Sequence, residues 1–186
     1  MRSALLLLVL AAFCANPGPS EAKSRPTLER TRALPSLCHP PEVALFQCAV
    51  GAKQLAICAA DAPGTAQYRY GVPGKVELAY PAAPQAGPSP LKWATTGYSG
   101  GGETQVSFEN AGVTYIIYSR MVRTGFGKDG HHNPQDELGV AALKGAKLLS
   151  NRRCRAAKIE GGHDDWIDEQ RAKQLLLPGP FVDIPE

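Results

Sequence analysis

Residues 97–101 carry the pattern Gly-x-Ser-x-Gly, in which hydrolases place a nucleophilic serine on a sharp turn between a strand and a helix. Ser99 would be the nucleophile, with Asp136 and His163 as its acid and base partners. The residues after Gly102 alternate between polar and apolar as in a strand, and the chain lacks the regular succession of strands and helices of such hydrolases. We therefore predict a glycine-rich turn here and a protein that is not an enzyme. A serine hydrolase is the least favoured alternative.

A second glycine pattern, Gly-x-Gly-x-x-Gly at residues 125–130, matches the dinucleotide-binding fingerprint. That fingerprint needs a helix directly after it, so that the phosphates meet helix N–H groups. The next four residues, His-His-Asn-Pro, cannot begin such a helix, so we predict no cofactor. Asp129, His131 and His132 could hold zinc or copper, but adjacent histidines rarely face one ion. We predict a solvated loop at residues 125–134 and no metal, with a metal site as the alternative.

Three consecutive glycines at residues 100–102 permit positive φ angles and close approach of the backbone to another surface. They could form either a recognition loop that enters a partner's cleft or a flexible connector. Aromatic side chains beside adaptable loops are common at protein interfaces, which favours recognition. The predicted partner-binding residues are Trp93, Tyr98, Ser99, Gly100, Gly101, Gly102 and Glu103.

Strand patterns surround these residues. Residues 104–109 alternate as a half-buried strand, a turn follows at 110–112, and residues 113–118 are β-branched or aromatic throughout, as in a central strand. Further hairpins are predicted at 42–50 with 54–60, at 67–70 with 75–80 and at 138–143 with 146–150, with another strand at 91–98 and a proline-rich loop at 81–90. The predicted fold is all-β, an antiparallel barrel of about eight strands or a strongly curved sheet.

The C-terminal extension, residues 156–186, shows a different pattern. Asp164 and Asp165 can cap a helix, and residues 166–176 are good helix formers that end before Pro178. The apolar stripe is narrow. We predict a short helix that docks loosely on the barrel or orders only with a partner.

The N-terminal residues predict export. Arg2 precedes an apolar run at residues 4–15, and small residues flank a cleavage point after Ala22. Residues 1–22 are predicted as a cleaved signal peptide, with a short membrane anchor as the alternative, and residues 23–37 as a flexible leader. The protein is then secreted, to the periplasm or the cell exterior, and no membrane span is predicted in the mature chain.

Charge and cysteines narrow the class of protein. Twenty basic and seventeen acidic residues give +3, and the signal peptide takes one of each, which is too mild a charge to predict nucleic-acid binding. Four cysteines remain: Cys38, Cys48, Cys58 and Cys154. In an oxidising compartment they predict two disulfides, with three pairings open, rather than a zinc site. The predicted disulfide-linked domain is residues 38–155.

Phe-Gln-Cys at residues 46–48 and the segment 145–154 resemble the first strand and the closing strand of bacterial C-type lysozyme inhibitors of the periplasm and envelope. The resemblance covers roughly residues 48–154. It implies an antiparallel barrel and a Cys48–Cys154 disulfide, which leaves Cys38 to pair with Cys58. It also implies a lysozyme, or another wall-active enzyme, as the partner.

That family's inhibitory loop reads Ser-Gly-x-x-Tyr. Ser99 and Gly100 keep its first part, whereas Glu103 stands at the tyrosine position. A carboxylate there would meet the acidic catalytic pair of a lysozyme and be repelled unless it is protonated or turned away. The sequence thus predicts a secreted protein-binding module with lysozyme inhibition as its candidate activity. The alternative is a structural or accessory envelope domain without inhibitory activity.

Overall fold

The computed structural model describes residues 33–84, 87–155, 159–160 and 166–185. The predicted signal peptide and residues 23–32 of the predicted leader lie outside the described residues. Within the described parts, no helix combines the length and the apolar character that crossing a membrane requires.

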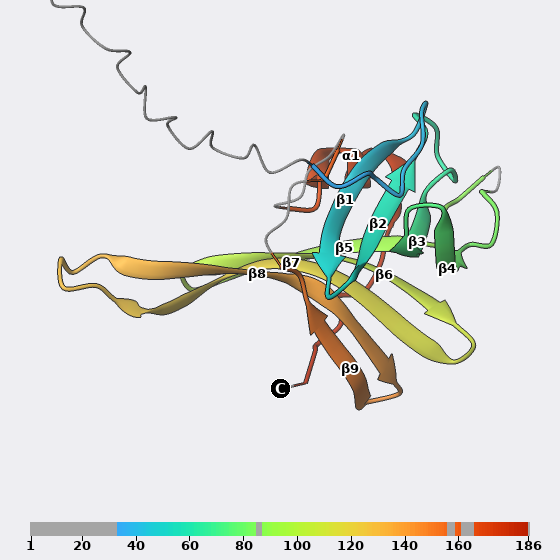
Figure 1. The fold of residues 1–186 in the computed structure, drawn as a ribbon. Helices are drawn as coiled ribbons and strands as arrows, with labels where there is room; N and C mark the ends of the chain where they lie inside the picture. Colours follow the sequence, from blue (N-terminus) through green and yellow to red (C-terminus); the bar gives the residue numbers. More distant parts are fainter. Residues whose placement is uncertain (1–32, 85–86, 156–158, 161–165, 186) are drawn as a thin grey trace, which may run out of the picture. The chain divides into compact units, whose positions relative to one another are not determined.

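The first half of the chain forms a four-stranded antiparallel sheet (Figure 1). Its two hairpins are those that the sequence predicts, and the second turns at Gly74 with a φ of +80°. The strands, in spatial order, are β1 (Val43–Val50), β2 (Lys53–Ala59), β3 (Gln67–Val72) and β4 (Lys75–Tyr80).

The second half forms a six-stranded sheet in the order β10-β5-β6-β7-β8-β9. All neighbours are antiparallel except β10, which runs parallel to β5. Their bounds are β5 (Lys92–Tyr98), β6 (Gly101–Asn110), β7 (Val113–Phe126), β8 (His132–Lys144), β9 (Lys147–Arg153) and β10 (Leu177–Pro178).

The all-β prediction is confirmed, but the predicted closed barrel is wrong. The described strands number ten and make two separate sheets. Closure would require β4 to pair with β5, yet the proline-rich segment after Tyr80 carries the chain from one sheet to the other. The free edge of β5 is instead taken by β10. Between β1 and the chain after β9, one isolated bridge, Ala49 with Arg155, joins the sheets.

The main core lies between the two sheets. Residues of the first sheet, such as Phe46 and Tyr68, pack in one cluster with residues of the second, such as Ile117. The Phe108 ring stacks between Tyr80 and Tyr115, with centroid separations of 4.5 and 5.0 Å. Large aromatic rings in offset contact bury much apolar surface, so this cluster holds the sheets together.

Two disulfides link the chain, Cys38–Cys58 and Cys48–Cys154. This is the pairing that the family resemblance implies, and it is confirmed. The second bond closes a loop of 106 residues and joins β1 to the residue after β9. Two disulfides fit an extracellular or secreted protein, because an oxidising compartment preserves them.

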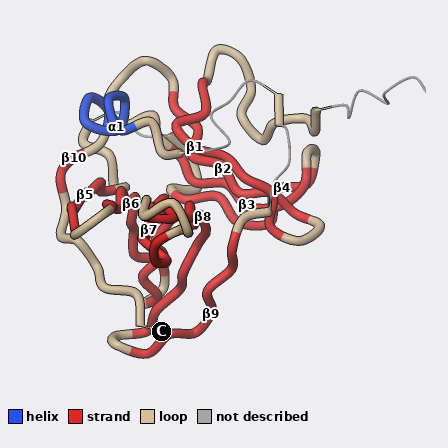
Figure 2. Tube along the Cα trace, turned by 90° about the vertical axis from the view of Figure 1, so that its left-hand side faces the viewer, coloured by secondary structure: helices blue, strands red, loops and turns tan. Residues whose placement is uncertain are grey.

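The C-terminal helix α1 (Glu169–Leu175) begins later than predicted, with Asp168 as its N-cap. Asp164 and Asp165, the predicted caps, lie outside the described residues. The helix is docked more tightly than its narrow apolar stripe indicates. Ala172 and Leu175 are buried in the main core, and the Asp168 N–H donates to the Leu45 carbonyl at 2.8 Å. Figure 2 shows α1 beside β1 and the β10–β5 edge.

The last residues cover the opposite face of the six-stranded sheet. The Gln105 amide is fully buried and forms two hydrogen bonds with the Val182 backbone, at 2.9 and 3.0 Å. Val182 and Ile184 pack against Ile116 and Leu143. The Gln105 amide thus donates to the Val182 carbonyl and accepts from the Val182 N–H, as a backbone peptide unit of a neighbouring strand would. The described tail is therefore built into the fold.

The predicted leader is also packed in its described part. Leu37 is 1% exposed and lies against Ala56 and Cys58, and the Ser36 hydroxyl donates to Gln47 at 2.8 Å. Leu34 forms a parallel bridge with Ile159. The packed chain thus begins before Cys38.

Candidate functional site

The predicted recognition residues lie at the turn between β5 and β6. Tyr98 pairs with Gly101, so Ser99 and Gly100 form the two-residue turn, and Gly100 has a φ of +83°. Tyr98 is 41% exposed and Ser99 is exposed. A strand follows this turn, as the alternation predicts, so Ser99 does not stand on the strand-to-helix elbow of a hydrolase.

The glycine run has a structural role. A Cβ at Gly101 would overlap the carbonyl oxygen of Met121 on β7, and one at Gly100 would lie 2.5 Å from the Arg123 Nε. Only glycine allows the two backbones to approach so closely while the turn takes a positive φ. Of the two interpretations of the run, these contacts argue against a flexible connector, and recognition by this turn stays a prediction.

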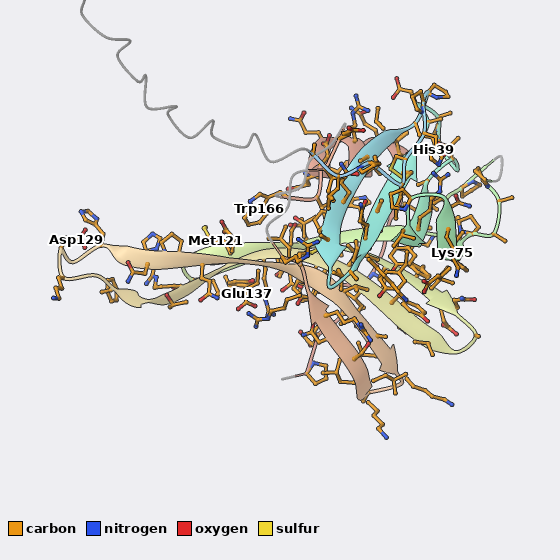
Figure 3. The ribbon with its side chains drawn as sticks, in the orientation of Figure 1. His39, Lys75, Met121, Asp129, Glu137 and Trp166 are labelled. Atoms are coloured by element: carbon orange, nitrogen blue, oxygen red, sulfur yellow. A yellow bond between two sulfur atoms is a disulfide. The ribbon has the colours of Figure 1, made fainter. Side chains whose placement is uncertain are left out.

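Beside this turn, β7 and β8 run on beyond their neighbours. The last β6 partner of β7 is Gly102, opposite Met121, and the first β9 partner of β8 is Gly139. Residues 122–135 therefore form a two-stranded hairpin, here called the arm, which projects from the sheet in Figure 1. Figure 3 places Asp129 at its far end, and Met121 and Glu137 at its base. The predicted loop at 125–134 is wrong in extent, because strand pairing continues to Phe126 and His132.

The tip of the arm contains the second glycine pattern. The Gly127 N–H donates to the His131 carbonyl at 2.6 Å. The element that follows is β8, where the sequence predicts a loop, and not the helix that the dinucleotide fingerprint needs. Asp129 accepts a hydrogen bond from the His131 backbone at 3.1 Å, and both side chains are exposed, as is His132. Among the described residues, no group of three or more histidines, cysteines or acidic residues could hold a metal ion.

Arg123 at the base of the arm contacts the turn between β5 and β6. The Arg123 side chain lies on the backbone of Gly100, and its guanidinium carbon is 5.4 Å from the centroid of the Phe126 ring. Phe126 is 67% exposed. Tyr98 pairs with Gly101, whereas Arg123 shares the face of Met121 and Gly102, so Tyr98 and Arg123 lie on opposite faces of the sheet. The Tyr98 ring packs against Gly101, and its hydroxyl donates to the Gly102 carbonyl at 3.2 Å. We call Ser99, Gly100, Arg123 and Phe126 the recognition surface.

Two of the predicted site residues face elsewhere. Trp93 is half-buried against the main core, and the Lys173 Nζ of α1 lies 5.3 Å from its ring centroid. Glu103 is 6% exposed, and its carboxylate accepts a hydrogen bond from the Gln105 amide at 2.7 Å. Trp93 is therefore a packing residue, and Glu103 does not project towards a partner.

Glu103 begins a row of charges that crosses four strands. Arg120 on β7 lies 3.8 Å from Glu103 and donates two hydrogen bonds to Glu137 on β8, at 2.8 and 2.6 Å. Arg153 on β9 holds the other oxygen of Glu137 at 2.9 Å. Burial tends to raise the pKa of Glu137, but the hydrogen bonds and charges of the two arginines outweigh it and lower that pKa. Burial raises the pKa of Glu103 by more than the Gln105 hydrogen bond and the Arg120 charge lower it, so the pKa of Glu103 is raised.

Replacing Glu103 with glutamine is expected to stabilise the protein at pH 7. The raised folded-state pKa means that the charged carboxyl disfavours folding at neutral pH, and that this cost disappears as pH falls through the folded pKa. Urea unfolding at pH 7 and pH 4 measures the change. The variant should have a larger free energy of unfolding than the native protein at pH 7, and this difference should disappear at pH 4. A loss of stability at pH 7 would show that the Arg120 contact matters more than burial.

Arg123 and Phe126 are absent from the sequence-based site. Val122, Thr124 and Phe126 continue the alternation of β7, and this signal could have extended the strand. The glycines at 125 and 127 conceal it, because they are typical of a loop.

Searches of protein-family models, curated proteins and solved structures found no significant match to this chain. The resemblance to C-type lysozyme inhibitors therefore stays a prediction from the sequence.

Proposed function

We propose that this chain is a secreted, non-enzymatic domain of the cell envelope that binds a partner protein through the recognition surface. The observation that supports this proposal is the contact of the exposed Arg123 with the Gly100 backbone and with the exposed Phe126 ring, beside a turn held by close glycine contacts. Arginine is enriched among the residues that dominate binding energy at interfaces, and phenylalanine is enriched at the core of interfaces. A rigid backbone lowers the entropy that binding must overcome.

Lysozyme inhibition, in the periplasm or outside the cell, is the candidate activity. Glu103 was the obstacle to it, since a carboxylate would be repelled by the acidic catalytic pair of a lysozyme. Glu103 is buried beside Arg120, whereas Arg123 on β7 carries an exposed guanidinium against the turn. A guanidinium can bind a carboxylate through two parallel hydrogen bonds, so the sign of the surface suits an acidic cleft.

A binding titration with variants tests this proposal. Native protein and the double variant Arg123→Ser with Phe126→Ser are titrated by calorimetry against C-type, G-type and I-type lysozymes. The double variant should lose roughly 2 kcal/mol or more, about thirtyfold in Kd, for any lysozyme that the native protein binds. Leu149→Ser is the matched control, because Leu149 is a large apolar residue, 49% exposed, on β9.

Binding of no lysozyme type would remove the inhibitor proposal. Equal losses of lysozyme affinity in the double variant and in Leu149→Ser would refute the role of the recognition surface in binding. The alternative, a structural or accessory envelope domain, would then be favoured by the packed C-terminal tail and the row of charges, which both serve the fold. A hydrolase that uses Ser99 is the least supported function, because its serine lies between two strands.

A further inference from the structure

A pocket of 390 Å³ opens between the two sheets, away from the recognition surface. It lies where the β1–β2 turn faces the strands β8 and β9, and its volume is in the range of small-molecule sites. Its lining comes from both sheets and includes Lys53, Tyr68 and Tyr70 of the first and Tyr115 and Arg152 of the second.

Three tyrosines give the pocket an aromatic interior. Tyr68 is 2% exposed and its ring lies 6.4 Å from that of Tyr115, while Tyr70 is half-buried on the same face of β3. Burial raises the pKa of Tyr68, so its hydroxyl stays neutral. Leu78 and Val140 add apolar surface beside the rings. Such a lining suits a flat apolar or aromatic body.

Two cationic side chains share the rim of the pocket. The Lys53 ammonium lies 5.3 Å from the centroid of the Tyr70 ring and pairs with Glu77 at 2.5 Å. That hydrogen bond raises the pKa of Lys53. Arg152 lines the same pocket from β9. Arg152 is exposed and forms no ion pair with another described residue. Like charges held together at a pocket mouth attract an anion.

We propose that this pocket binds a small amphipathic anion, with its aromatic or apolar body against the tyrosines and its carboxylate, sulfonate or phosphate between Lys53 and Arg152. This site is separate from the recognition surface and does not depend on the proposed function. Glu77 competes with the ligand for Lys53, so Arg152 supplies most of the recognition of charge.

Fluorescence titration with a matched pair of probes tests the proposal. One probe is 8-anilinonaphthalene-1-sulfonate, and the other is N-phenyl-1-naphthylamine, which has the same rings without the sulfonate. The native protein should bind the sulfonate at least about tenfold more tightly than the amine, because only the sulfonate reaches the two cations. Absence of sulfonate binding, or equal binding of both probes, would overturn the proposal.

Three variants locate the site. Arg152→Glu should weaken sulfonate binding at least about tenfold and leave amine binding unchanged. Lys147→Glu makes the same change of charge on an exposed residue of β9 outside the pocket, and should have no effect. Glu77→Gln frees Lys53 and should tighten sulfonate binding. If Arg152→Glu and Lys147→Glu weakened sulfonate binding equally, the loss would come from overall charge, and the proposed site would be refuted. Weaker sulfonate binding by Glu77→Gln would refute the role of Lys53. Far-ultraviolet circular dichroism confirms that each variant is folded.

Discussion

Replacing Cys48 and Cys154 with alanine is expected to lower the free energy of unfolding by about 5 kcal/mol. The bond between them closes a loop of 106 residues, and in the chain-entropy model a longer loop restricts the unfolded chain more. It also joins the first sheet to the end of the second, where an isolated bridge between Ala49 and Arg155 also links the backbones. A loss of this size approaches the whole stability of many single domains, so the variant should be largely unfolded at 37 °C.

The Cys38–Cys58 bond provides the matched comparison. It closes a loop of 20 residues, for which the same model gives about 3 kcal/mol. Urea unfolding of the two double-alanine variants, followed by circular dichroism, measures both losses. If the short loop cost more than the long one, chain entropy would not explain the stabilisation.

Replacing Arg120 with methionine is expected to destabilise the protein by about 3 kcal/mol at pH 7. Arg120 is the shared partner of Glu103 and Glu137, whose side chains are 6% and 10% exposed. Without it, two nearly buried carboxylates keep their charges and lose their closest cation. Breaking a buried ion pair from one side costs more than the pair itself contributes.

The pH dependence of this variant follows from the same carboxylates. Loss of Arg120 raises the folded-state pKa of both groups, so the variant regains stability as pH falls and the carboxylates take up protons. Arg153→Met is the control, because Arg153 also contacts Glu137 but is 56% exposed, and it should cost less than about 1 kcal/mol. Equal costs for the two variants, measured by urea unfolding from pH 4 to pH 7, would contradict this account of the row of charges.

The hairpins were predictable because each depends on local patterns. Alternation at residues 67–70 and 75–80, with Pro73 and Gly74 between them, is enough to define β3 and β4 and their turn. The disulfide pairing came from the resemblance, since four cysteines alone leave three possibilities.

The arrangement of the sheets was not predictable in the same way. Which strand edges pair depends on contacts between distant residues, such as Leu177 with Lys92, and such pairs leave no periodic signal. The local sequence around Glu103 likewise shows that this carboxylate alternates with Thr104. It does not show that Arg120 and Gln105 hold the carboxylate in a buried position. Burial of a charge is decided by its partners, which come from other strands.

Site-specific photo-crosslinking tests the central claim, that the recognition surface binds a partner protein, most directly. A benzophenone amino acid is placed at position 126 in one protein and at position 149 in another, and each is irradiated in cells that produce the protein naturally. Phe126 and Leu149 are both exposed, at 67% and 49%, so both positions offer access to neighbouring proteins. The account predicts a discrete crosslinked partner from position 126 that is absent from position 149 and is lost when Arg123 is replaced by serine. Identical products from both positions, or no product from position 126, would contradict it.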